Sequence, residues 1–172
     1  MTDKVTPDEL SFERVLDAPI DKVWRYLVEP DLRSTWFMAG PTDLRVGGKF
    51  GMTMDHDKLS DDQVATPDKY KPYVGNSWSE KILAFDPPTL LTIEWEEGKA
   101  GQVTFALSPE GESRTRLILT HTGLRGHSDA KNFGSGWASH LAVLERRLRG
   151  ERVPNFWALH ADAEQEMKAA LG

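Results

Sequence analysis

The first third of the chain has the apolar pattern of one strand followed by two short helices. Residues 10–16 (LSFERVL) place Leu10, Phe12 and Leu16 on one face of a predicted strand. Pro19 suits the first turn of a helix, and apolar positions then recur at helical spacing: Ile20, Val23, Trp24 and Leu27. Pro30 ends this helix, because a proline disfavours the helical conformation of the residue before it. A second short helix is predicted over residues 32–37.

The middle of the chain alternates with a period of two and predicts an antiparallel meander. Residues 43–46 and 49–54 predict a hairpin about Gly47-Gly48. Residues 55–71 (DHDKLSDDQVATPDKYK) are polar and acidic and predict a long exposed loop. Loops of this length are commonly functional lids or disordered segments. Further strands, joined by short turns, are predicted over residues 74–85, 90–95, 101–107 and 115–122.

The last third is predicted to be helical. One apolar stripe marks a long helix: Phe133, Trp137, Leu141, Leu144 and Leu148. Gly150 is well placed to end that helix, and residues 156–171 predict a second, weaker one. An antiparallel sheet with helices on one face is an α+β arrangement. We expect a single domain over residues 1–150, with residues 151–172 as a helical extension that packs on the domain or at an interface.

Composition and charge narrow the class of protein. The chain has 172 residues and a formal net charge of −6, which argues against broad binding of nucleic acid or anionic membranes. It has no cysteine, so it forms no disulfide, thiolate metal site or cysteine nucleophile. No stretch approaches the roughly 20 apolar residues of a membrane span, and the first ten residues have no signal-peptide core. We therefore expect a cytoplasmic protein without membrane insertion.

Five segments between Leu10 and Leu148 resemble, in order, the SRPBCC or START-like superfamily: FERVLDAPIDKVWRYLVEPDLRSTWF, GGKF, SEKILAFDPPTLLTIEW, TRLILTHTGL and GWASHLAVLERRL. Within it, the chain is similar to the group named after the C-terminal domain of activators of the heat-shock-protein-90 ATPase. The resemblance implies the helix-grip (Bet v 1-like) fold, in which a curved antiparallel sheet of six to seven strands wraps around a long C-terminal helix. Two short helices follow the first strand. The long 55–71 segment and the residues after Gly150 depart from a compact member of the group.

The resemblance also implies a cavity between the sheet and the long helix. Members of the superfamily bind lipids, polyketides, plant hormones or flavonoids, and a few are cyclases or hydrolases, so the fold does not decide the function. We expect binding of a small hydrophobic or aromatic ligand that is lipid-, polyketide- or flavonoid-like. Two alternatives stay open: a cyclase- or hydrolase-like enzyme using the same cavity, and a protein-interaction or chaperone-cofactor-like module with an apolar surface around Phe156 and Trp157. A homodimer also stays open.

The candidate ligand-binding residues are mainly aromatic, methionine and histidine side chains. Aromatic rings offer flat stacking faces, and methionines adapt to irregular ligands. The same side chains would otherwise fill a packed core, which is their commoner role. The predicted set comprises Trp36, Phe37, Phe50, Met52, Met54, Trp78, Trp95, Phe105, His121, Trp137, His140 and Leu141.

Three titratable residues within the predicted strands and helix are singled out. His121 and His140 are expected to meet across the cavity and supply polar contacts, or a general base in the enzyme alternative. The simpler interpretation of each is a hydrogen-bonded core histidine. Glu80, beside Trp78 on a predicted strand, is expected to form an exposed cross-strand ion pair. If it is buried instead, its carboxylate needs a partner, such as Arg116, or a raised pKa.

No motif predicts a catalytic residue, a metal site or a cofactor. The sequence has no G-x-S-x-G elbow and no H-E-x-x-H pair. The acidic run that begins at Asp55-His56-Asp57 lacks the central glycine and terminal glutamate of a calcium-binding loop. That run is typical of a solvated acidic loop.

Overall fold

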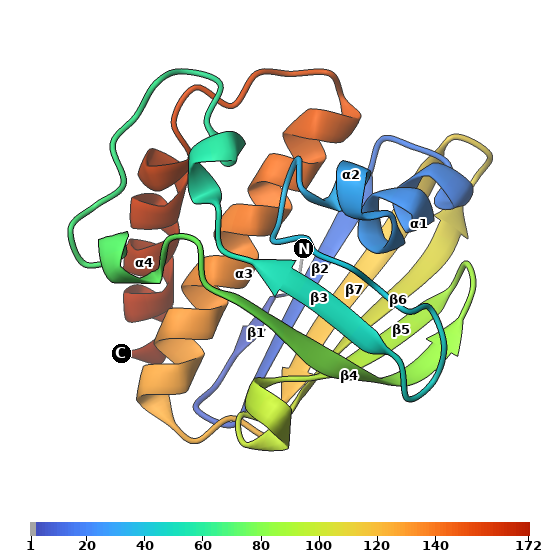
Figure 1. Cartoon of the computed structure of the whole chain (residues 1–172), viewed down its shortest axis with the longest axis horizontal. Coiled ribbons are helices and arrows are strands. Elements are labelled where there is room, and N and C mark those ends of the chain that lie inside the picture. Colours follow the sequence, from blue (N-terminus) through green and yellow to red (C-terminus); the bar gives the residue numbers. More distant parts are fainter. Residues whose placement is uncertain (1–2) are drawn as a thin grey trace.

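The computed structural model describes residues 3–172 and shows one seven-stranded antiparallel sheet (Figure 1). The spatial order of the strands is β1-β2-β7-β6-β5-β4-β3. Their bounds are β1 (Lys4–Val5), β2 (Glu9–Leu16), β3 (Lys49–Thr53), β4 (Ser77–Asp86), β5 (Leu90–Glu94), β6 (Gln102–Glu110) and β7 (Arg114–Thr122). The short β1 lies at one edge beside β2, β2 pairs with the last strand β7, and the meander runs back from β7 to β3 at the opposite edge. The predicted α+β helix-grip architecture is confirmed.

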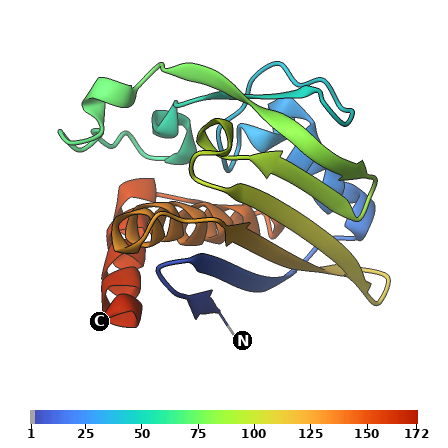
Figure 2. The same cartoon turned by 90° about the horizontal axis from the view of Figure 1, so that it is seen from below.

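Four α-helices complete the fold: α1 (Ile20–Val28), α2 (Pro30–Arg33), α3 (His127–Leu148) and α4 (Phe156–Leu171). Figure 2 shows α3 lying along the inner side of the curved sheet, with α4 beside it. The core fills the space between α3 and the sheet and includes Phe12, Phe105, Leu119 and Leu141, each at most 1% exposed. None of the helices in residues 3–172 is long and apolar enough to cross a membrane.

The predicted strand over residues 43–46 is wrong. These residues form a tight turn, in which the Arg45 N–H donates to Asp43 O and the Gly48 N–H donates to Arg45 O. Only Thr42 pairs with the neighbouring strand, in a single bridge to Phe50. Local hydrogen bonds thus replace the ladder that the alternation suggested, and β3 pairs with β4 instead. The second short helix also differs, because α2 ends at Arg33.

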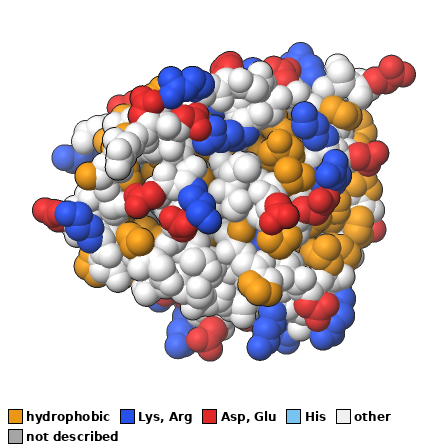
Figure 3. All heavy atoms as spheres, turned by 45° about the horizontal axis from the view of Figure 1, so that its top comes forward, with side chains coloured by type: hydrophobic (Ala, Val, Ile, Leu, Met, Phe, Trp, Pro, Cys, Tyr) orange, Lys and Arg blue, Asp and Glu red, His pale blue; other side chains and the backbone are white. Residues whose placement is uncertain are grey.

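The 55–71 segment is tied down, although many of its polar side chains are exposed. Asp61 forms an ion pair with Arg147 of α3 at 2.9 Å. Tyr70 shares a hydrogen bond of 2.7 Å with His160 of α4. The segment contains the 3-10 helix η1 (His56–Leu59) and ends where a second, η2 (Lys71–Tyr73), begins; a third, η3 (Glu96–Gly98), follows β5. Figure 3 shows charged side chains of both signs interspersed on one face, in keeping with such surface pairs.

Arg33 is the one fully buried cationic side chain among the described residues. Its guanidinium donates to backbone oxygens of Met38 at 3.0 Å, Leu27 at 3.1 Å and Gly51 at 2.8 Å. It also stacks over the ring of Phe50 at 3.8 Å. Arg33 therefore joins the end of α1, the connection after α2 and the edge strand β3, and so fixes the segment that carries Phe37 and Met38.

Candidate functional site

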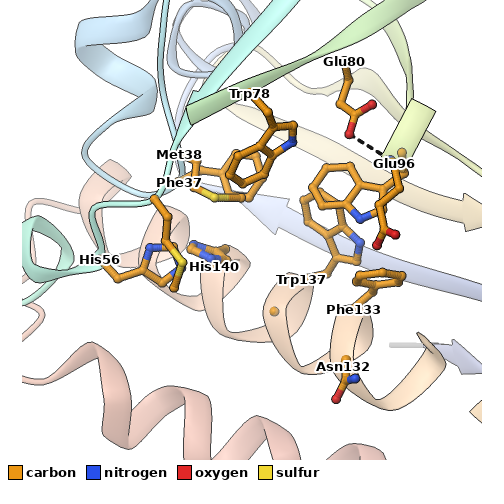
Figure 4. A pocket seen from close by; sticks show the side chains of 13 residues that line it. Phe37, Met38, His56, Trp78, Glu80, Glu96, Asn132, Phe133, Trp137 and His140 are labelled. Atoms are coloured by element: carbon orange, nitrogen blue, oxygen red, sulfur yellow. Dashed lines mark hydrogen bonds between the residues drawn. The ribbon is translucent and has the colours of Figure 1, made fainter. Parts of the chain in front are cut away.

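A cavity of about 290 Å³ lies between α3 and the β3–β4 edge of the sheet (Figure 4). Strand β4 contributes one wall, α3 the opposite wall, and the segments before and after β3 close one end. Exposed side chains of Trp78 and Glu96 lie at its mouth. Its lining comprises Phe37, Met38, Met54, His56, Trp78, Glu80, Trp95, Glu96, Asn132, Phe133, Gly136, Trp137 and His140.

Aromatic rings form most of the apolar wall. Trp137 is central, with ring centroids of Trp95 and Phe37 each 5.2 Å away. Phe133, one turn earlier on α3, lies 6.0 Å from Trp95. Trp78 is 37% exposed and forms no ring–ring contact with any residue of the described chain. Its free face is therefore open to a ligand, whereas Trp137 is both cavity wall and core.

Glu80 is buried, so the predicted exposed ion pair is wrong, and Arg116 is not its partner. Antiparallel pairing sets Glu80 opposite Phe50 and thus turns it inward. Its carboxylate accepts the backbone N–H groups of Glu96 at 2.8 Å and Glu97 at 3.1 Å. Burial raises the pKa of Glu80, and these two hydrogen bonds act against that rise. Arg116 instead pairs with Glu13 and Glu110 on the outer face.

The carboxylate of Glu80 also holds an unusual turn at the cavity mouth. Glu96 and Glu97 have φ angles of 51° and 58°, in the left-handed region that disfavours residues with a Cβ. Two consecutive residues in this conformation cost roughly 1–2 kcal/mol each. Hydrogen bonds from both of their N–H groups to one carboxylate offset that cost and set the position of Trp95 and Glu96.

Two histidines close the other end of the cavity. The Nδ1–H of His140, on α3, donates to the Trp36 carbonyl at 2.8 Å, because a carbonyl oxygen can only accept. The His56 ring packs edge-on against it, with centroids 4.8 Å apart. Burial lowers the pKa of His56 to about 4 and that of His140 well below its ordinary value. Both rings are therefore neutral at pH 7.

His121 does not meet His140, contrary to the prediction. The Nδ1 atom of His121 accepts the Trp137 indole N–H at 3.0 Å, so its Nε2–H donates to the Ala100 carbonyl at 2.8 Å. His121 is fully buried behind Trp137 and lines no part of the cavity. It acts as a hydrogen-bonded core histidine that orients the Trp137 ring.

Six of the twelve predicted residues line the cavity: Phe37, Met54, Trp78, Trp95, Trp137 and His140. The other six lie in the surrounding core: Trp36, Phe50, Met52, Phe105, His121 and Leu141. Trp36 is not at the entrance, because its indole N–H donates to the Tyr26 carbonyl and its ring is 1% exposed. Phe50 faces inward as predicted, but the Arg33 guanidinium covers it.

Sequence reasoning missed Met38, His56, Glu80, Glu96, Asn132, Phe133 and Gly136 as lining residues. Phe133 had a usable signal, since it begins the apolar stripe of α3. His56 follows the inward-facing Met54 by two positions, which continues the strand alternation, but its acidic neighbours obscured that signal. Among residues 3–172, no group of three or more His, Asp or Glu side chains is placed to hold a metal ion.

Comparison with known proteins places this geometry in a family. A family model described as Activator of Hsp90 ATPase homolog 1-like protein matches residues 17–149. The chain belongs to this family. The match spans α1 to the end of α3, so it includes every element that lines the cavity. A search of curated proteins gave no match.

Solved structures support the same assignment. A protein from Bordetella parapertussis is 33% identical, with a TM-score of 0.80, over 99% of this chain and 96% of that one. CalU16 from Micromonospora echinospora is 25% identical, with a TM-score of 0.70, over 98% and 96%. The Aha1 dimer from Colwellia psychrerythraea is 16% identical, with a TM-score of 0.60, over 81% and 95%, and shows the shared fold alone.

Proposed function

We propose that this Hsp90-ATPase-activator-like protein binds a small hydrophobic or aromatic ligand, lipid-, polyketide- or flavonoid-like, in the cavity beside α3. The observation that carries the proposal is the unpaired ring of Trp78 facing the wall of Trp95, Trp137 and Phe37. Small-molecule sites are typically concave, largely apolar and supplied with a few polar groups. A volume of about 290 Å³ suits a compact body of two or three rings better than a long acyl chain.

The comparisons support a ligand-binding role in general terms and name no ligand. DynU16, a protein in the dynemicin biosynthetic locus, has the same fold at 19% identity and a TM-score of 0.64, over 86% of this chain and 49% of that one. A homodimer remains a second proposal, because the Colwellia relative is described as a dimer. Light scattering after size-exclusion chromatography tests it directly.

The enzyme alternative rests on one side chain, His140. Its Nε2 atom is the basic position left after Nδ1–H donates to Trp36 O, and the ring lines the cavity. A second histidine offers no such access. His160 Nδ1, on α4, lies 3.2 Å from Ser139 Oγ on α3, and both residues are buried. The interaction alternative loses its predicted surface, because Phe156 is fully buried and Trp157 is 8% exposed.

Replacing Trp78 with alanine is expected to weaken ligand binding at least tenfold while changing the free energy of unfolding by less than about 1 kcal/mol. The reason is that Trp78 lines the cavity yet has no ring partner and is 37% exposed. Titration calorimetry with a panel of flavonoids, polyketides and fatty acids measures the binding, and urea unfolding measures the stability.

The matched control for this variant is Tyr73→Ala. Tyr73 is a 53% exposed aromatic residue near the start of β4 that does not line the cavity. Its removal should leave binding unchanged. Equal binding by wild type and Trp78→Ala would contradict the proposed site. Trp137→Ala is a poorer test, because losing a buried tryptophan costs about 3–5 kcal/mol by itself.

A further inference from the structure

The cavity wall carries negative charge only. Its lining includes the carboxylates of Glu80 and Glu96 and no lysine or arginine. His56 and His140, the other titratable groups of the lining, are neutral at pH 7 because burial lowers their pKa values. A ligand that enters therefore meets two carboxylates and no formal positive charge on the wall.

The nearest cations do not neutralise the buried carboxylate. Arg125 pairs with Glu96 at 3.2 Å and with Asp129 at 2.8 Å, and it forms no ion pair with Glu80. Lys99 lines an adjoining hollow that shares Trp78, Glu80 and Glu96 with the cavity, and it forms no ion pair with Glu80 either. Among residues 3–172, Glu80 has no ion-pair partner, and its carboxylate accepts hydrogen bonds from two backbone N–H groups and from the Trp78 side chain. A carboxylate can accept about four hydrogen bonds, so Glu80 can accept another from a ligand.

Aromatic faces next to a carboxylate are chemically suited to one kind of group. The ring of a tryptophan attracts a cation placed over its face, and the attraction grows when water is excluded. Trp78 precedes Glu80 by two positions on the same face of β4, and Trp95 precedes Glu96 in the chain. Figure 4 shows the side chains of Glu80 and Glu96 on the side of the cavity away from His56 and His140.

We infer that the cavity selects a ligand in which an apolar or aromatic body carries a protonated amine. The ammonium group would lie at the Glu80 end, against the ring of Trp78, and the apolar body would extend along Trp137 towards Phe37. Ligands that carry a carboxylate are disfavoured, because like charges would face each other in a partly dry site. This inference rests on the proposed function and narrows its ligand class.

The test uses three naphthalene probes that differ only in one substituent at the same ring position: aminomethyl, hydroxymethyl or carboxylate. Titration calorimetry at pH 7 measures the Kd of each probe for the full chain. The amine is expected to bind at least tenfold more tightly than the alcohol, and the carboxylate more weakly than both. An amine that binds no better than the alcohol overturns the ligand class while leaving the cavity as a binding site.

Three single-residue variants test which carboxylate causes the preference for the amine probe over the alcohol probe. Glu80→Gln should bring the amine within about threefold of the alcohol without changing the affinity for the alcohol. Glu96→Gln, at the exposed mouth, should reduce the preference several-fold and remains informative if Glu80→Gln does not fold. Glu97→Gln removes the same charge without removing a wall carboxylate, because Glu97 does not line the cavity, and should leave the preference intact.

Two further outcomes count against the inference. An amine preference that survives both Glu80→Gln and Glu96→Gln would show that the wall carboxylates do not cause it. Absence of binding for all three probes at millimolar concentration would overturn the proposed function together with the ligand class, and so is distinguishable from loss of the preference alone.

Discussion

Replacing Arg33 with methionine is expected to lower the free energy of unfolding by about 3–5 kcal/mol, because it leaves buried oxygens without their hydrogen-bond donor. Three backbone oxygens, of Leu27, Met38 and Gly51, receive hydrogen bonds from this guanidinium in a fully buried position. Methionine has a similar length but no donor, so it leaves these oxygens without their partner. Each unsatisfied buried group costs about 1–3 kcal/mol, which is large against a typical total stability of about 5–15 kcal/mol.

The charge of Arg33 is balanced by dipoles instead of a carboxylate. Burial lowers its pKa to about 10, so the guanidinium stays charged at pH 7. The Leu27 oxygen belongs to the last turn of α1, where the helix presents partial negative charge. Arg33→Lys keeps the charge, but an ammonium group lacks the planar guanidinium, whose separate nitrogens donate to Leu27, Met38 and Gly51 at once. It is therefore expected to be destabilised as well.

Urea unfolding followed by circular dichroism at pH 7 measures these changes. Arg25→Met is the matched control, since Arg25 is an arginine of α1 that pairs with Glu29 and both side chains of that ion pair are exposed. Exposed pairs contribute about 0–1 kcal/mol, so this variant should unfold almost as the wild type does. A loss below about 1 kcal/mol for Arg33→Met would mean that the three oxygens find other partners.

The order of elements was predictable because their local signals agree with their tertiary environment. Strands β2, β4, β5, β6 and β7 carry period-two alternation, and α3 carries a continuous apolar stripe. The exception, residues 43–46, alternates in sequence but bonds to itself around Gly48. There a Cβ would lie 2.0 Å from the Asp43 oxygen. The close approach of Gly48 to Asp43 depends on the path of the chain between α2 and β3, which the periodicity of apolar residues does not describe.

The cavity was harder to predict than the fold, because long-range pairing decides which inward side chains border it. Phe50 and Glu80 face each other across β3 and β4, yet Arg33 covers Phe50 and the cavity reaches Glu80. Arg33 gave no usable signal, since its partners are the Thr42 hydroxyl and backbone oxygens from three separate segments. The alternation identified the inner face of the sheet, but the inner face is larger than the cavity.

Lowering the pH from 7 to 5 is expected to destabilise the protein, with His56 alone contributing about 2 kcal/mol. An unfolded histidine has a pKa of about 6.5, whereas burial, reinforced by His160, lowers that of folded His56 to about 4. Between these values the unfolded chain binds a proton that the folded chain does not. Unfolding therefore takes up protons, and stability is lost as the pH falls through this range.

Three more histidines act in the same direction. Burial lowers the pKa values of His121, His140 and His160. The contacts agree with this direction: protonation of His121 at Nδ1 would remove the acceptor of the Trp137 indole N–H. Glu80 acts oppositely, because burial raises the pKa of its carboxyl group in the folded state. More than one proton should therefore be taken up on unfolding near pH 5.5.

Urea unfolding at a series of pH values from 7.5 to 5 measures this dependence as the slope of stability against pH. His56→Gln should reduce the slope near pH 5.5 by almost one proton, because it removes a half-buried ring that packs against His140 and Trp157 and has a lowered pKa. His127→Gln is the control, since His127 is exposed at the start of α3 and is solvated in both states. A stability equal at pH 7 and pH 5 would contradict the burial of these rings, and with it the closed end of the cavity that His56 and His140 form.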